Sequence, residues 1–253
     1  MHNNECIFEV CVDSLESAMA AERGGARRVE LCSSLLEGGV TPSAGLIATA
    51  RQKLSIGLHI MIRPRAGDFC YAAEEIDVMR RDVLMAKQLG ADSVVFGILD
   101  ADGNVDIQKT RELVDLARPL PTTFHRAFDM SADLSRSLEQ VVEAGANRIL
   151  TSGGAQSALE GAATLHSLVE LAEERVIIMA GGGINAQNVQ TVIDKTGVRE
   201  IHVGLRTPAA SPMRYRKEDI SMGTLKGNEF TRFTLPEEKV VQLIKAAGRC
   251  GEM

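Results

Sequence analysis

Short runs of β-branched and other apolar residues alternate along the chain with longer segments whose apolar residues recur at helical spacing. The short runs predict eight strands, spaced by about 28 residues on average and beginning near Ile7, Arg28, Gly57, Ser93, Pro121, Arg148, Val176 and Glu200. Helices are predicted between and after them, over 14–25, 43–54, 71–90, 106–118, 133–145, 157–174, 186–197 and 236–248. Each interval has the size of one strand plus one crossover helix.

This alternation indicates the fold class. Eight βα units in a chain of 253 residues favour a (β/α)8 TIM barrel, an α/β fold, over a doubly wound open sheet. We therefore predict a single TIM-barrel domain over 1–253. A long irregular segment, 207–235, follows the last strand and exceeds the length of a simple connector. We expect it to lie as a lid over the C-terminal mouth of the barrel.

Composition excludes several classes of partner. The net charge is −6, and the chain has no Trp and 2 Tyr, which argues against binding to nucleic acid or to anionic membranes. No apolar run approaches the length of a membrane span, and residues 1–6 lack the features of a signal peptide, so we expect a cytoplasmic protein. The 5 cysteines are dispersed without a CxxC pair, which indicates reduced thiols rather than a disulfide framework.

Polar residues occupy strand positions that should face the barrel interior. Residues two apart share a face, and the outer face must meet apolar helices, so charged positions such as Glu9 and Glu30 point inward. The same rule turns a larger set inward: Cys11, Asp13, Cys32, Ser34, His59, Met61, Arg63, Arg65, Thr123, His125, Ala127, Asp129, His202, Gly204 and Arg206. Structural barrel interiors are mainly Val, Ile and Leu, so this set predicts a site at the mouth. The alternative is a purely structural network of ion pairs.

Candidate catalytic groups are those able to move protons. The four candidates are Glu9, Glu30, His125 and Asp129. The predicted strands contain no Lys for a Schiff base, and no Ser lies in a GxSxG elbow.

Glycine-rich turns follow the sixth and seventh strands. Their backbone N–H groups, together with arginines at strand ends, predict a phosphate or carboxylate site. The residues of this predicted site are Arg63, Arg65, Ser152, Gly153, Gly182, Gly183 and Arg206. The alternative for the glycines is a pair of tight turns that need positive φ.

Two cysteines occupy equivalent inward positions on neighbouring strands. Cys11 and Cys32 offer thiolate ligands, and Met61 on the next strand offers a thioether, a ligand set that suits Cu(I). Zinc is less favoured, because no HxH or HExxH cluster is present. The alternative is that both cysteines are small core residues.

The chain resembles the CutC family of copper homeostasis proteins along essentially its whole length. The motifs that carry the resemblance are FEVCVD (8–13), RVELC (28–32), EGGVTPS (37–43), MIRPR (61–65), TFHRAFD (123–129) and LTSG (150–153). The resemblance implies a cytosolic, homodimeric TIM-barrel protein that handles copper, with Cys11 and Cys32 as the Cu(I) ligands.

Two functional hypotheses follow. The first is a Cu(I)-binding copper homeostasis protein. The second is an enzyme of unidentified reaction that acts on a small anionic or phosphorylated metabolite at the barrel mouth.

Overall fold

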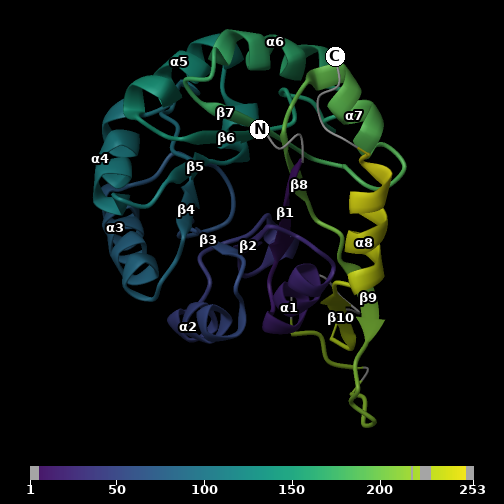
Figure 1. Ribbon diagram of the computed structural model, residues 1–253. Helices are drawn as coiled ribbons and strands as arrows, with labels where there is room; N and C mark the ends of the chain where they lie inside the picture. The colour runs from purple at the N-terminus through teal and green to yellow at the C-terminus, as the bar shows by residue number, and fades with distance from the viewer. Residues whose placement is uncertain (1–5, 218, 223–228, 249–253) are drawn as a thin grey trace.

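Eight parallel strands close into a barrel in the computed structural model, which describes residues 6–217, 219–222 and 229–248 (Figure 1). Each strand pairs with the next along the chain, and β1 pairs with β8. The strands are β1 (Ile7–Val12), β2 (Arg28–Leu31), β3 (Gly57–Met61), β4 (Ser93–Phe96), β5 (Thr122–Phe124), β6 (Arg148–Thr151), β7 (Ile177–Gly181) and β8 (Glu200–Val203). The predicted TIM barrel is confirmed.

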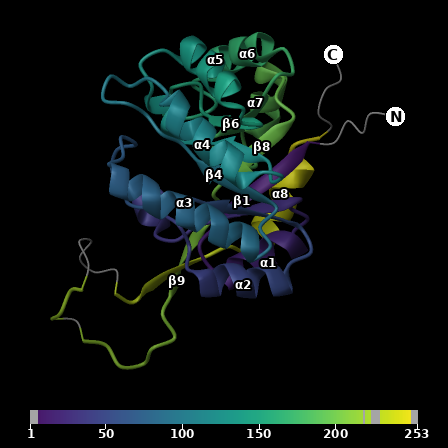
Figure 2. The same ribbon diagram turned by 90° about the vertical axis from the view of Figure 1, so that its left-hand side faces the viewer.

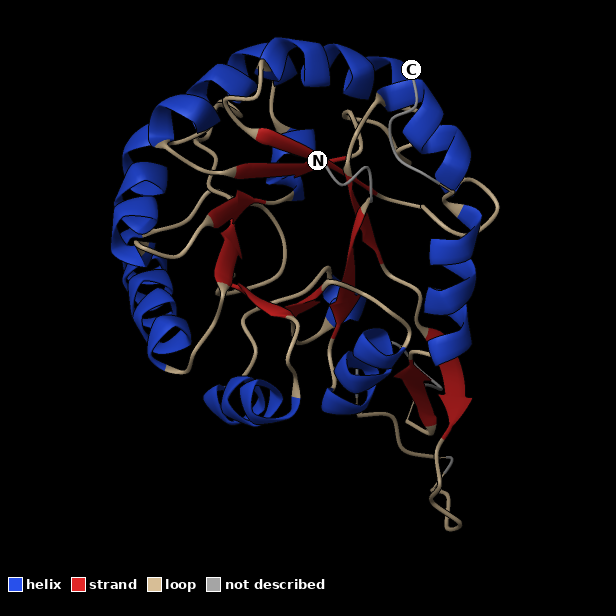
Figure 3. Ribbon diagram, viewed as in Figure 1, coloured by secondary structure: helices blue, strands red, loops and turns tan. Residues whose placement is uncertain are grey.

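Helices form a ring around the strands (Figure 3). They are α1 (Leu15–Arg23), α2 (Ala44–Lys53), α3 (Ala73–Gln88), α4 (Ile107–Ala117), α5 (Leu134–Ala144), α6 (Ala162–Ala172), α7 (Val189–Thr196) and α8 (Glu237–Ala246), with two 3₁₀ helices, η1 (Leu35–Glu37) and η2 (Arg126–Met130). Side-chain hydrogen bonds cap the starts of several helices. At the start of α2, for example, Ser43 Oγ accepts from the Leu46 amide at 3.2 Å. Gly145, at φ 89°, ends α5 in the left-handed conformation that glycine adopts freely. No helix in the described ranges is long and apolar enough to cross a bilayer.

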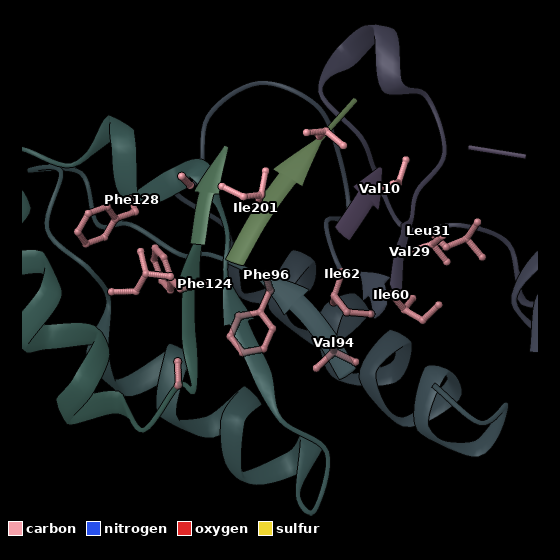
Figure 4. Close-up of a cluster of buried hydrophobic side chains, with 14 of the residues drawn as sticks. Val10, Val29, Leu31, Ile60, Ile62, Val94, Phe96, Phe124, Phe128 and Ile201 are labelled. Carbon is pink, nitrogen blue, oxygen red and sulfur yellow. The ribbon is translucent and has the colours of Figure 1, made fainter. Parts of the chain in front are cut away.

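The apolar core lies between the barrel and the helices. Strand residues of outward parity, such as Val10, Ile60 and Phe96, are fully buried there (Figure 4). Burying one such large side chain contributes roughly 1.5–3 kcal/mol. Since this layer carries the hydrophobic stabilisation, the barrel interior is free to hold polar side chains.

The segment after β8 departs from the prediction. Two short strands, β9 (Thr207–Ala210) and β10 (Thr231–Thr234), pair as an antiparallel hairpin beside α1, where Arg232 contacts Glu16 at 3.1 Å. Figure 2 shows that the described residues between them, 211–217, 219–222 and 229–230, project away from the ring of helices. Within its described residues, this segment contributes nothing to the lining of the large cavity at the mouth. The predicted lid is therefore wrong for the described residues of this segment, which pair as the β9–β10 ladder and do not cover the cavity.

Candidate functional site

Ion pairs cross the interior at the N-terminal end of the barrel. Arg28 donates to Glu9 at 2.8 Å and also to Glu200, and Arg148 Nε donates to Glu200 Oε2 at 2.5 Å. Arg28 on β2 and Arg148 on β6 each reach Glu200 on β8 past one intervening strand, so these bonds lie inside the barrel. All four side chains are buried, so the charges compensate one another in place of water.

The same contacts shift two carboxyl groups. Burial alone would raise the pKa of Glu9, but His59, His202 and Arg28 hold it well below its ordinary value. Burial would likewise raise the pKa of Glu200, but Arg148 and Arg28 lower it. Both groups are therefore ionised partners in a structural network, which is the alternative considered for the inward charges. Glu9, predicted as catalytic, lies in this network, below the cavity described next.

A thiol pair lies above this network. The Sγ atoms of Cys11 and Cys32 are 3.8 Å apart, and Cys32 Sγ donates to Glu30 Oε2 at 3.5 Å. His202 Nδ1 is 2.8 Å from Glu9 Oε1, and its Nε2 is 3.7 Å from Glu30 Oε2. The structure thus brings together two cysteines, a carboxyl group and an imidazole from three adjacent strands.

The two thiols differ in protonation. The hydrogen bond from Cys32 lowers the pKa of Cys11 to about 5. Burial opposes this shift, and contacts with His202 add to it. The same contact with Cys11, together with burial, raises the pKa of Cys32 well above its ordinary value. Burial and the Cys11 thiolate also raise the pKa of Glu30 well above its usual range. At neutral pH the pair is therefore one thiolate beside one thiol.

The surroundings of the thiols suit a soft metal ion. Cys32 and Met61 belong to one small apolar cluster, against which Cys11 packs. The sulfur atoms of Cys11 and Cys32 and a carboxylate oxygen of Glu30 all lie within 4.8 Å of one another. Elsewhere, Cys6 is disulfide-bonded, so the expectation of reduced thiols is wrong at that position, whereas Cys11, Cys32 and Cys70 are free.

A cavity of about 880 Å³ opens above the thiol pair at the barrel mouth. Cys11, Glu30 and His202 line it from the strands, and most of the remaining lining comes from the loops after β3, β4 and β5. Apolar side chains contribute much of the wall, including Met61, Phe69, Leu99, Met130 and Leu150. Its size is that of a site for a small molecule.

His125 lies in the wall of this cavity in a neutral form. Its strand, β5, ends one residue earlier, and its Nδ1 accepts from the Ala127 amide at 3.2 Å at the start of η2. Burial, together with the nearby Arg63 charge, lowers the pKa of His125 to about 3. The ring is therefore uncharged at neutral pH, and its proton resides on Nε2.

Asp129 fills the turn that was predicted to bind an external anion. Its carboxylate accepts from the backbone amides of Ser152 and Gly154 at 3.0 Å, and from the Thr151 hydroxyl. Arg126 Nε donates to the same carboxylate at 2.7 Å. The amides of this turn are thus engaged by a side chain of the protein itself. Asp129 reaches them because the chain leaves strand geometry for η2.

The predicted anion-binding arginines do not converge. Arg63 lines the cavity but donates its Nη groups to carbonyls, among them Gly39 at 2.9 Å and Gly67 at 2.8 Å. Arg65 pairs with Glu75 at 2.5 Å and lies outside the cavity lining. Arg206 donates to the Leu35 carbonyl at 3.1 Å and lines a separate pocket of about 230 Å³.

The glycines adopt left-handed turns. Gly153, Gly182 and Gly183 have φ of 73°, 103° and 68°. A Cβ on Gly182 would lie 3.4 Å from Arg126 Nη1, so this turn packs against the arginine that holds Asp129. These contacts fit the alternative interpretation of the glycines as tight turns.

Several site residues were not expected. Arg126 has outward parity in an extended strand, yet it lines the cavity because η2 breaks the alternation. Arg28, Arg148 and Glu200 open their strands at inward positions, and extending the parity rule by one step to the first strand residue would have found them.

The fold and the site together define a TIM-barrel protein with a partly buried thiol pair beneath an open cavity at its mouth. The chain belongs to the CutC family, whose sequence pattern matches residues 6–207. The mouse copper homeostasis protein cutC homolog is 48% identical over 220 residues, covering 87% of this chain and 81% of that protein. A family protein CutC from Bacteroides thetaiotaomicron is 46% identical over 241 residues, covering 94% and 97%.

A solved structure of a CutC protein supports the same assignment. The CutC protein of Streptococcus agalactiae superposes with a TM-score of 0.75 at 37% identity, covering 78% of this chain and 97% of that one. Phosphoribosylanthranilate isomerase from Thermotoga maritima superposes with a TM-score of 0.56 at 14% identity and shows the barrel fold alone.

Proposed function

We propose that this CutC-family protein binds Cu(I) through Cys11 and Cys32, with Met61 as a third candidate ligand. The observation that carries this proposal is the 3.8 Å separation of the two Sγ atoms at a site where Cys11 is already a thiolate. Thiolate and thioether sulfur are soft ligands that select Cu(I). The names of the mouse and human relatives, copper homeostasis protein cutC homologs, support a role with copper.

Metal binding at this pair would release a proton. Cys32 is a thiol in the absence of metal, and a metal-bound sulfur is deprotonated, so affinity should rise with pH.

Anaerobic titration with Cu(I) against a chromophoric chelator tests the proposal. We expect about one Cu(I) per chain, lost in a Cys11→Ser/Cys32→Ser double variant and retained in Cys70→Ser, which removes an exposed free thiol. Stoichiometric binding by the double variant would refute the assignment. Binding lost equally in Cys70→Ser would place the metal elsewhere.

The cavity favours a second candidate function. Its volume exceeds what a single metal ion needs, and His125 and Arg126 line it without a role in copper binding by the thiols. An enzyme acting on a small anionic metabolite accounts for these residues. Consumption of a metabolite by the purified protein, absent in His125→Asn, tests this alternative.

We also propose that the protein works in the cytoplasm as a homodimer. The resemblance to the CutC family supports both statements, and sedimentation velocity measures the assembly directly.

A further inference from the structure

A glutamate, a histidine and a cysteine lie together inside the barrel where β1 pairs with β8. Glu9 on β1 is the register partner of His202 on β8, and Cys11 is the next residue of β1 on the same inward face. The pairing of two neighbouring strands therefore places the imidazole next to both the carboxylate and the thiol.

Hydrogen bonds link the three side chains in series. His202 Nδ1 is 2.8 Å from Glu9 Oε1, and His202 also forms a side-chain hydrogen bond with Cys11. The other oxygen of Glu9 accepts from Arg28 at 2.8 Å, so Glu9 is an ionised carboxylate, which can only accept. The proton between Glu9 and His202 therefore resides on Nδ1, and Nε2 is the ring nitrogen left to exchange a proton with the thiol.

The three residues differ in their access to the cavity. Glu9 is fully buried, whereas His202 and Cys11 line the cavity of about 880 Å³. Cys11 is partly exposed, and its neighbour Cys32 is fully buried. A buried carboxylate that orients an imidazole, which in turn contacts an accessible thiol, is the arrangement of a cysteine nucleophile with its general base.

We propose that Cys11, His202 and Glu9 form a catalytic triad with which the metal-free protein hydrolyses small carboxylic esters or thioesters in the cavity. This inference rests on the second proposed function and names the reaction of that enzyme. Cys11 and His202 are the catalytic residues, and Glu9 is a positioning residue that holds the His202 ring. Met61 and Leu150 in the cavity wall offer an apolar surface to the acyl chain.

The reaction balances with water as the co-reactant. The Cys11 thiolate forms a bond to the carbonyl carbon, and the bond to the leaving alcohol or thiol breaks as His202 Nε2 gives that group its proton. Water then attacks the acyl carbon, and Nε2 takes a proton from this water as the bond to Sγ breaks. The products are a carboxylic acid and an alcohol or thiol, and both catalytic residues return to their starting forms.

The probe is 4-nitrophenyl acetate, mixed with metal-free protein that carries Cys70→Ser. This substitution removes an exposed thiol and leaves Cys11 as the free cysteine with solvent access among the described residues. We expect a burst of about one nitrophenolate per chain, then steady release, with the acetyl group on Cys11. Absence of the burst, or a burst that persists when Cys11→Ser is added, would overturn the proposal.

His202→Asn distinguishes a triad from a thiol that reacts without help. The Asn side-chain nitrogen can still donate to Glu9, but no group is left to exchange a proton with Cys11 or with water. We expect steady release to fall by about a hundredfold or more, and unchanged release would overturn the proposal. If this variant fails to fold, steady release by the parent protein should be slower in D₂O than in H₂O, because His202 moves a proton in each step. Equal rates would overturn the proposal.

Glu9→Gln tests the positioning role. Gln can still accept from His202 Nδ1, but it lacks the charge that stabilises the imidazolium. We expect kcat to fall while KM for the ester is unchanged, because Glu9 does not line the cavity. An unchanged kcat, or a change confined to KM, would overturn the role assigned to Glu9.

Copper titration separates this proposal from the first proposed function. Cys32→Ser should lose Cu(I) and keep turnover, since a hydroxyl group can donate to Cys11 as the thiol does. Copper binding without acetylation in the parent protein would overturn the triad and keep the copper site, and acetylation without copper binding would do the reverse. Turnover of another metabolite that needs His125 but survives Cys11→Ser would keep the second proposed function and overturn the nucleophile.

Discussion

Replacement of Glu200 by Gln tests whether the ion pairs at the base of the barrel hold the structure together. Glu200 is 5% exposed and accepts from Arg28, from Arg148 Nε at 2.5 Å and from Arg148 Nη2 at 3.3 Å. Gln keeps the volume and removes the charge, which leaves Arg28 paired with Glu9 alone and the buried Arg148 guanidinium without a carboxylate partner among the described residues. Breaking a buried pair in this way costs about 3–5 kcal/mol in the free energy of unfolding.

A matched control is available on the surface. Glu139 accepts from Arg175 at 2.7 and 2.8 Å, but the two side chains are 50% and 37% exposed. Glu139→Gln should therefore cost about 1 kcal/mol or less. Urea unfolding followed by circular dichroism compares both variants with the parent protein. If Glu200→Gln costs no more than Glu139→Gln, the claim that the buried network stabilises the fold is refuted.

The difference in the free energy of unfolding between the parent protein and Glu200→Gln should depend on pH, which supplies a second check. Arg148 and Arg28, acting against burial, lower the pKa of Glu200 below its ordinary 4.5. Its stabilisation is fully present above that ordinary value and is lost as pH falls through the lower pKa of the folded state. The gap between the parent protein and Glu200→Gln should thus be constant near neutrality and shrink only below about pH 4. A gap that shrinks between neutrality and pH 5 would contradict this account.

Two further predictions concern the site. Alkylation of Cys11 by iodoacetamide, measured in a Cys70→Ser background, should stay fast from neutrality down to the Cys11 pKa of about 5 and slow below it. Cys32→Ala should move this midpoint upward because it removes the hydrogen bond that stabilises the thiolate, and an unchanged midpoint would contradict that cause. Asp129→Ala should speed hydrogen exchange at the Ser152 and Gly154 amides by about tenfold or more, since each loses its charged acceptor. Exchange no faster than in the parent protein would show that the turn keeps its order without Asp129.

The barrel could be predicted from the sequence because its signal is periodic. Eight repeats of one strand and one helix, with capping residues such as Ser43 and Asp133, leave few alternatives. The hairpin of β9 and β10 was missed because its strands are short and Pro208 lies within one of them. Pairing of these strands depends on contacts between distant segments, which local patterns do not report.

The site was predictable only where strand alternation continues. Cys11, Glu30 and His202 lie on full strands, and the parity rule turns them inward as observed. Beyond Phe124 the chain enters η2, so the rule fails for Arg126 and gives no reason for the position of Asp129. The mutual distances of inward side chains, such as the contact between Cys11 and Cys32, depend on the stagger of the barrel and require the structure.

The ion pairs of Arg28, Arg148 and Glu200 also bear on how a ligand reaches the thiol pair. Their guanidinium and carboxylate groups are buried inside the barrel below the thiol pair, and TIM-barrel interiors are packed rather than open along the axis. Whatever reaches Cys11 and Cys32 must arrive and depart through the same opening. If the thiols bind copper as proposed, a copper donor and a copper acceptor would have to use this opening one after the other.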